Sequence, residues 1–223
     1  MLRRNGGGDA LIGFDGDDTL RGGEDGDSLF GDAPGAGADS IEGGNGDDSV
    51  FAGAGNDSID AGADDDLIAG EDGADTIAGG GSSDLALGGA GADQIQGADG
   101  ADTLYGDAGA DALNGCNGDD RVYGAGDDGS LGGGDGAADV LVIGANASGL
   151  RQINLGNAAN QNVSGSGPTV TGFEAVDAST ATAGVTITGA VFGATGNVLI
   201  GSAQADSITG VYREFHPVDS RLN

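Results

Sequence analysis

The sequence predicts an all-β fold: a right-handed parallel β-roll, or β-solenoid, with two short strands in each coil of about eighteen residues. Three observations predict it. A nine-residue unit recurs from residue 4 to residue 142, Asp and an aliphatic residue keep fixed places within it, and the last place alternates in character from one unit to the next. Repetition at a fixed short period is typical of solenoids, which need a cap over their exposed coil ends. We expect a less regular β segment to provide that cap.

Gly43–Phe51 gives the unit in its clearest form: Gly-Gly-Asn-Gly-Asp-Asp-Ser-Val-Phe. Successive sixth places hold Asp9, Asp18, Asp27, Asp39, Asp48, Asp57, Asp66, Asp75, Asp84, Asp93, Asp102, Asp111, Asp120, Gly129 and Asp139. Successive eighth places hold Leu11, Leu20, Leu29, Ile41, Val50, Ile59, Ile68, Ile77, Ala86, Ile95, Leu104, Leu113, Val122, Leu131 and Leu141. The period slips twice, by three residues around Ala33–Gly35 and by one near Gly134.

Each unit is expected to consist of a glycine-rich turn and a strand formed by its last three residues. Because side chains alternate along a strand, the eighth-place aliphatic residue points into a narrow core while its two neighbours point outward. The ninth place is apolar or aromatic in odd-numbered units and mostly polar in even-numbered units, counted from residue 4. This alternation predicts two strands in each coil and two parallel sheets packed back to back.

The charge of the chain is extreme: 37 acidic residues against 7 basic ones, for a formal net charge of −30. Such a chain repels nucleic acid and anionic lipid, and it needs counter-ions before it can become compact. No segment approaches the run of about 18 apolar residues that a membrane span requires. The single cysteine, Cys116, excludes an internal disulfide and stands where other units have glycine.

Stacked turns would place the sixth-place carboxylates in rows, one coil apart, where their charges repel. A single Asp in a glycine-rich turn can simply accept backbone hydrogen bonds, but a whole row of them needs cations. Carboxylates together with turn carbonyls are the ligands that Ca²⁺ prefers, whereas Mg²⁺ requires a tighter octahedron. Zinc is disfavoured, since the chain has one Cys and one His. The cofactor predicted from the residues is therefore Ca²⁺, as multiple ions.

Gly43–Phe51 and Gly88–Gln96 match the pattern Gly-Gly-x-Gly-x-Asp-x-aliphatic-x at every defined place. The chain thus resembles the RTX (repeats-in-toxin) nonapeptide repeat, a calcium-binding β-roll family. The resemblance implies that ions lie between turns stacked on the same edge, bound by the fourteen sixth-place Asp residues and by turn carbonyls. The glycines that this implies as ligands are Gly44, Gly46, Gly53, Gly55, Gly89 and Gly91. It also implies a secreted or cell-surface location and export by type I secretion.

Some units depart from that pattern. The fourth-place glycine is replaced by Asp25, Asp64, Ser82, Asp127 and Ala137, and four of these five replacements fall in odd-numbered units. The turns of even-numbered units, which carry Asp18, Asp39, Asp57, Asp75, Asp93 and Asp111, are therefore predicted to hold the better-ordered ions. Ions near Asp27, Asp66 and Asp84 are expected to be less well ordered.

An apolar stripe is expected on the outer face of one sheet, formed by Phe30, Phe51, Leu87, Tyr105 and Tyr123. Long apolar patches seldom stay exposed. Two interpretations remain open: the stripe is covered by the segment after Ile143 or by the tail, or it is a docking face for a second copy or another protein.

Composition shifts at Gly144, where Asp gives way to Asn, Thr, Ser and Ala. We therefore divide the chain into a roll (4–142), a β-solenoid continuation or cap (143–210) and an irregular tail (211–223). Short strands are predicted at Gln152–Leu155, Thr169–Thr171, Glu174–Val176, Val185–Thr188 and Asn197–Ile200. Gly201–Thr209, with Asp206 and Ile208 in the expected places, is interpreted as one further degenerate unit.

The predicted function is that of an extracellular calcium-binding structural β-roll that folds on binding Ca²⁺ after secretion. The alternative is a repeat module of a larger secreted enzyme, toxin or surface adhesin whose active part lies outside this chain. No catalytic residue is predicted, because Ser, His and Asp that are merely close in sequence, as in His216–Ser220, do not make a catalytic triad.

Overall fold

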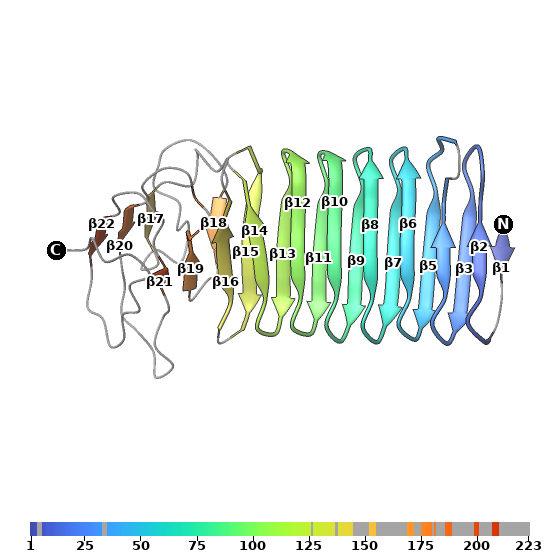
Figure 1. The fold of residues 1–223 in the computed structure, drawn as a ribbon, viewed down its shortest axis with the longest axis horizontal. Coiled ribbons are helices and arrows are strands. Elements are labelled where there is room, and N and C mark those ends of the chain that lie inside the picture. Colours follow the sequence, from blue (N-terminus) through green and yellow to red (C-terminus); the bar gives the residue numbers. More distant parts are fainter. Residues whose placement is uncertain are drawn as a thin grey trace.

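The computed structural model shows a long two-sheet solenoid (Figure 1). It describes residues 1–3, 6–32, 35–125, 127–136, 138–144, 152–154, 169–171, 175–179, 181, 186–188, 199–200 and 207–209. Among these residues all regular secondary structure is β-strand. None of them forms a helix of the length and apolarity that a membrane crossing demands.

Two large sheets make up the roll, and a third, small sheet lies in the C-terminal part. Sheet A consists of β1 (Leu2–Arg3), β3 (Thr19–Glu24), β5 (Ser40–Asn45), β7 (Ser58–Ala63), β9 (Thr76–Gly81), β11 (Gln94–Asp99), β13 (Ala112–Asn117), β15 (Ser130–Asp135) and β18 (Thr169–Thr171). Sheet B consists of β2 (Ala10–Ile12), β4 (Ser28–Phe30), β6 (Ser49–Ala54), β8 (Leu67–Asp72), β10 (Leu85–Gly91), β12 (Thr103–Gly109), β14 (Arg121–Gly124), β16 (Val140–Ile143), β19 (Ala175–Asp177) and β21 (Leu199–Ile200). Sheet C consists of β17 (Gln152–Asn154), β20 (Thr186–Thr188) and β22 (Ser207–Thr209).

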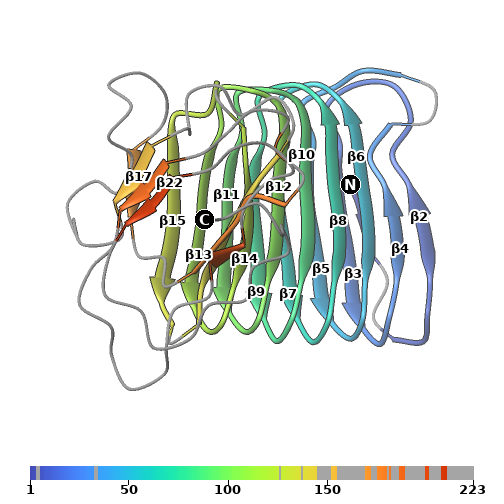
Figure 2. The same ribbon diagram turned by 60° about the vertical axis from the view of Figure 1, so that its left-hand side comes forward.

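The chain passes alternately through sheets A and B, so that one strand of each makes one coil (Figure 2). All pairings between neighbouring strands are parallel, and Leu85 pairs with Thr103, eighteen residues later. The two predicted slips are present: Thr19 pairs with Ser40 across the three extra residues, and Arg121 pairs with Val140 across the single one. The predicted coil of two strands and about eighteen residues is confirmed.

The strands are longer than the three residues expected for them. Most strands of the regular coils contain six or seven residues, because the ladder continues into the first places of the following unit. In β6, for example, Gly53 pairs with Glu71 and Ala54 with Asp72. The expectation that only places seven to nine are extended is therefore wrong, and the tight turn shrinks to places four to six. Strand pairing between coils here overrides the low strand propensity of glycine.

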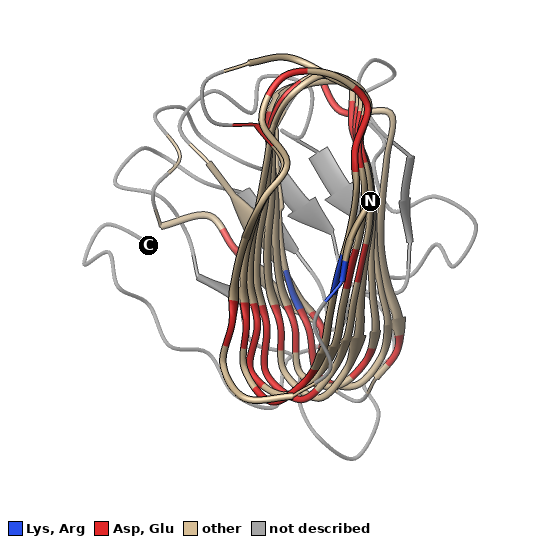
Figure 3. Ribbon diagram, turned by 90° about the vertical axis from the view of Figure 1, so that its right-hand side faces the viewer, with Lys and Arg blue, Asp and Glu red and all other residues tan. Residues whose placement is uncertain are grey.

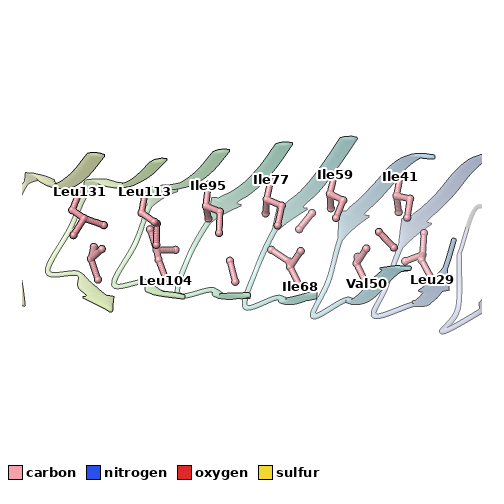
Figure 4. Packing of buried hydrophobic residues seen from close by; sticks show 14 of the residues in the cluster. Leu29, Ile41, Val50, Ile59, Ile68, Ile77, Ile95, Leu104, Leu113 and Leu131 are labelled. Carbon is pink, nitrogen blue, oxygen red and sulfur yellow. The ribbon is translucent and has the colours of Figure 1, made fainter. Parts of the chain in front are cut away.

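The core is a double row of aliphatic side chains between the sheets (Figure 4). Ile41, Ile59 and Ile77 project from sheet A toward Val50 and Ile68 of sheet B. All eighth-place residues are at most 3 % exposed. Burying each large aliphatic side chain contributes about 1.5–3 kcal/mol. The predicted core residues are thus confirmed.

The outer faces of the two sheets differ as the ninth-place alternation predicts. On sheet B the rings of Phe30 and Phe51 stack with centroids 5.4 Å apart, and those of Tyr105 and Tyr123 stack at 4.0 Å. The stripe residues are half-buried, partly against one another. On sheet A the corresponding place holds polar residues, including an Arg21–Glu42 ion pair of 2.5 Å.

The strands predicted after Gly144 are present, within one to two residues at their ends, as β17 to β22. β18 extends sheet A, while β19 and β21 extend sheet B. Val176 and Ala178 are buried and join the core of the roll. Asp206 and the tail after Gly210 lie outside the described residues.

Candidate metal-binding rows at the two edges of the roll

Acidic side chains gather at the two narrow edges of the roll, where the chain turns from one sheet to the other (Figure 3). Turns of even-numbered units lead into sheet A, and we call their side the even edge; turns of odd-numbered units lead into sheet B, on the odd edge. The even edge carries Asp18, Asp39, Asp57, Asp75, Asp93 and Asp111. The odd edge carries Asp9, Asp27, Asp48, Asp66, Asp84, Asp102, Asp120 and Asp139.

From the second coil onward, the sixth-place Asp is held by the coil before it. Asp75 Oδ1 accepts a hydrogen bond of 2.8 Å from the backbone N–H of Asp57, and Asp84 Oδ1 accepts one of 2.9 Å from Asp66. The same bond recurs along both edges, from Asp9 to Asp139 and from Asp18 to Asp111, at 2.7–2.9 Å. These aspartates therefore do accept backbone hydrogen bonds, but across coils, so each carboxylate is fixed in a row.

The second carboxylate oxygen, Oδ2, is buried and accepts no hydrogen bond along most of both rows. This applies to Asp27, Asp39, Asp48, Asp57, Asp66, Asp75, Asp84, Asp93, Asp102, Asp111 and Asp120. All of them are at most 4 % exposed, whereas Asp9 and Asp18 of the first coil are only half-buried. A buried carboxylate oxygen without a partner is costly, so a row of such oxygens is a candidate donor set for a cation.

The first-place glycine leaves room beside this oxygen. A Cβ at Gly97 would overlap Oδ2 of Asp102 on the odd edge, and a Cβ at Gly106 would overlap Oδ2 of Asp111 on the even edge. Glycine thus keeps the space around Oδ2 open on both edges. Ala52 and Ala61 occupy the first place before Asp57 and Asp66, where a methyl group narrows this space.

Backbone oxygens crowd the same turns. The six glycines predicted as ligands, Gly44, Gly46, Gly53, Gly55, Gly89 and Gly91, all have positive φ, between 108° and 152°. A Cβ at Gly91 would overlap the carbonyl oxygen of Gly73 in the previous coil, and one at Gly55 would overlap that of Gly37. Only glycine allows this approach. Their role as ligands stays a prediction.

Turns without a fourth-place glycine also have positive φ at that place. Asp25, Asp64 and Ser82 adopt φ of 71°, 77° and 82°, in the left-handed region that ordinary residues avoid, whereas Gly55 and Gly91 have φ of 146° and 152°. The odd edge therefore carries a conformational cost of about 1 kcal/mol or more at each such residue. Asp127 is exposed, and Ala137 lies outside the described residues.

Burial raises the pKa of the carboxyl groups in both rows. The pKa rises to about 7 for Asp66 and Asp84 and to about 6 for Asp48, Asp57, Asp102 and Asp111. It is also raised for Asp39, Asp75, Asp93 and Asp120. Loss of hydration is the largest cause, the cross-coil backbone hydrogen bond opposes it, and neighbouring carboxylates add to it. Full ionisation of these rows near neutral pH thus calls for a neighbouring positive charge.

Within the described part of the chain, no three Asp, Glu, His or Cys side chains converge on one point. A cation in these rows must therefore take most of its ligands from backbone carbonyls. Ca²⁺ accepts six to eight oxygen ligands of mixed carboxylate and carbonyl type, in flexible geometry. The donors present thus fit Ca²⁺.

Two aspartates with a buried carboxylate oxygen were missed by the sequence pattern. Asp128 is 5 % exposed, although it stands one place before Gly129, which occupies a sixth place. Asp32, beside the three-residue insertion, has a buried Oδ1 without a hydrogen-bond partner. Asp128 could have been noticed because it stands one place before the sixth place of a unit that lacks the sixth-place Asp. Nothing in the repeat marks Asp32.

Comparison with family models identifies the repeats. The model of the RTX calcium-binding nonapeptide repeat matches residues 5–33, 35–68, 51–86, 60–95, 78–113, 87–122 and 96–131. No curated protein matches the chain. Proteins with such repeats are typically secreted, extracellular or surface-associated, and the repeats themselves are typically non-catalytic. The chain belongs to the RTX calcium-binding repeat family, and its β-roll is a structural calcium-binding repeat module.

Proposed function

We propose that this protein is an extracellular structural β-roll that folds when Ca²⁺ fills the rows of carboxylates at its two edges. The observation that carries the proposal is the buried Oδ2 atom without a hydrogen-bond partner, repeated from Asp27 to Asp120. The proposed ligands are the fourteen sixth-place aspartates and the turn carbonyls, including those of Gly44, Gly46, Gly53, Gly55, Gly89 and Gly91.

Electrostatics supports coupling between ion binding and folding. Neighbouring coils of a sheet are about 4.8 Å apart, so ionised carboxylates in one row repel strongly at low dielectric. The formal net charge of −30 adds a repulsion over the whole chain. Divalent ions between coils turn both effects into attraction, so the free energy of ion binding becomes free energy of folding.

This coupling suits a secreted protein. Free calcium is scarce inside cells, so the chain would stay expanded and fit for export there, and it would fold outside. Type I secretion is the export route that we propose, in keeping with the family. Carboxylates that hold cations are poor general bases, so the role proposed for the roll is structural.

A calcium titration tests the proposal. The chain is stripped of metal at neutral pH and low salt, and its sheet content and hydrodynamic radius are followed by circular dichroism and light scattering. Ca²⁺ is expected to give a compact, sheet-rich form at concentrations at which Mg²⁺ does not, and NaCl of equal ionic strength should not replace it. A stripped chain that is already compact and rich in sheet would overturn the proposal.

A further inference from the structure

The even row of carboxylates is interrupted at Gly129, which has no side chain to place beside Asp111. The backbone slips at this point. The N–H groups of both Gly129 and Ser130 donate to the carbonyl oxygen of Asp111, at 2.7 and 3.1 Å. In a regular turn only the seventh-place N–H makes this bond, as Thr76 does to Asp57 at 2.9 Å. The slip moves the residue before Gly129 toward the core.

That residue is Asp128, and its burial sets it apart from its counterparts. The fifth-place residues of the regular coils are exposed, including Asp47, Asp65 and Asp119. Asp128 is only 5 % exposed, while its neighbour Asp127 is exposed. Its Oδ2 accepts a hydrogen bond of 2.7 Å from the backbone N–H of Ala125, which fixes the carboxylate inside the turn. Its Oδ1 is buried and accepts no hydrogen bond.

Asp128 lies beside Asp111, the last regular member of the even row, because the N–H of the next residue, Gly129, donates to the Asp111 carbonyl oxygen at 2.7 Å. Asp111 is fully buried, and its Oδ2 also accepts no hydrogen bond. The two carboxyl groups are close enough that each changes the pKa of the other. Two buried carboxylates, each with one free oxygen, form a site for a small cation that completes its shell with turn carbonyls.

We propose that Asp128 takes the place of the missing sixth-place carboxylate and, with Asp111, binds a divalent cation. The row of ions on the even edge then continues into the coil that contains Gly129. This inference rests on the proposed calcium binding of the regular coils, and it adds a ligand at a place where the nine-residue pattern has none.

Three variants test it. Asp128→Asn removes the proposed ligand, whereas Asp127→Asn makes the same change of charge one residue away on the surface. The double variant Asp128→Gly/Gly129→Asp moves the carboxylate back to the sixth place. A Cβ at Gly129 lies 3.4 Å from the nearest atom, the carbonyl oxygen of Asp111, so this exchange fits sterically.

Native mass spectrometry at saturating calcium can count the ions, because the chain weighs only 21.2 kDa. Asp128→Asn is expected to bind at least one ion fewer than the wild type, while Asp127→Asn and the double variant keep the wild-type number. Equal numbers for Asp128→Asn and Asp127→Asn would overturn the inference. If calcium binding as a whole were wrong, the wild type itself would show no saturable ions, so the two failures can be told apart.

A measurement on the unaltered protein covers the case in which Asp128→Asn does not fold. A crystal grown with calcium is expected to show an anomalous peak between the carboxylates of Asp111 and Asp128. A calcium-loaded roll with peaks between Asp75 and Asp93 but none at Asp128 would contradict the inference.

Discussion

The interior of the roll contains two kinds of buried row, and they contribute to stability in opposite ways. The eighth-place aliphatic residues stabilise the fold with or without metal, because their burial removes apolar surface from water. The sixth-place aspartates are equally buried, yet their Oδ2 atoms lack hydrogen-bond partners. The comparison shows that the aliphatic rows favour folding whether or not metal is present, whereas the carboxylate rows favour it only when positive charge or protons neutralise them.

Lowering the pH should partly replace calcium in stabilising the fold, because protons neutralise the buried carboxylates. We expect this to be the largest effect on stability, since many aspartates titrate together. Their pKa values in the fold, about 6 for Asp57 and about 7 for Asp66, exceed the ordinary value of 3.8. The folded chain therefore binds more protons than the unfolded chain between about pH 4 and pH 7. Stability of the calcium-free fold should be greatest at low pH and be lost as the pH rises through 6 to 7.

Circular dichroism of metal-stripped protein between pH 8 and pH 5 checks this. The lower limit stays above the isoelectric point of about 4.1 and so avoids precipitation. Sheet content should rise toward pH 5, and the calcium concentration needed to fill the carboxylate rows should rise as well, since protons compete for the same oxygens. A loss of sheet on acidification would contradict the prediction.

Truncating the aliphatic row should destabilise the fold whatever the metal content. Ile77 is 1 % exposed, and Ile77→Ala should cost about 2–5 kcal/mol. Urea unfolding is to be compared for calcium-loaded protein at pH 7 and metal-stripped protein at pH 5. The free energy of unfolding is expected to fall by a similar amount in both conditions. A decrease confined to the calcium-loaded form would argue against an aliphatic core that stabilises the fold independently of calcium.

Neutralising one member of the carboxylate row should lower the stability of the fold in only one of those two conditions. Asp75→Asn should destabilise the calcium-loaded roll by about 2 kcal/mol, because a charged ligand is lost. It should leave the stripped, acidic form nearly unchanged, since burial raises the pKa of that carboxyl and so favours its neutral form there. Asp72→Asn, an exposed change in the same unit, serves as the control and should have little effect in either. Equal losses for Asp75→Asn in both conditions would assign Asp75 a purely structural hydrogen-bonding role.

The two edges should differ in the order of their ions. Asp25, Asp64 and Ser82 hold left-handed conformations on the odd edge, where glycine would cost less. We expect a calcium-bound crystal to show better-ordered ions near Asp57 and Asp75 than near Asp27, Asp66 or Asp84. Equal occupancy on both edges would remove the distinction.

Backbone strain gives the smallest effect. Ala98 has φ of 83° in the second place, so Ala98→Gly should stabilise the roll by up to about 1 kcal/mol. Ala63 has no positive φ, and Ala63→Gly in β7 should destabilise by about 0.5–1 kcal/mol. Thermal unfolding of the calcium-loaded variants measures whether each substitution stabilises or destabilises the roll. A destabilising effect of Ala98→Gly would contradict the strain argument.

Much of this arrangement could be predicted from the sequence because the repeat encodes it locally. The alternation of the ninth place predicted the two sheets, and residues such as Ile59 and Leu104 predicted the core. Three features escaped prediction. Strand pairing through Gly53 depends on the neighbouring coil, the inward turn of Asp128 depends on a slip of the backbone, and the Oδ1 contacts depend on coils eighteen residues apart. Each of these follows from contacts between coils, which a single nine-residue unit does not contain.

The eighteen-residue register has a mechanical consequence. Since strands pair only with those one coil away in the regular part of the roll, order can advance along the axis one coil at a time, like a zipper. Pulling the two ends apart should therefore release chain in increments of about 60 Å, the extended length of one coil. If ions lie between coils as proposed, withdrawing calcium during such a pull would lower the force of every increment together.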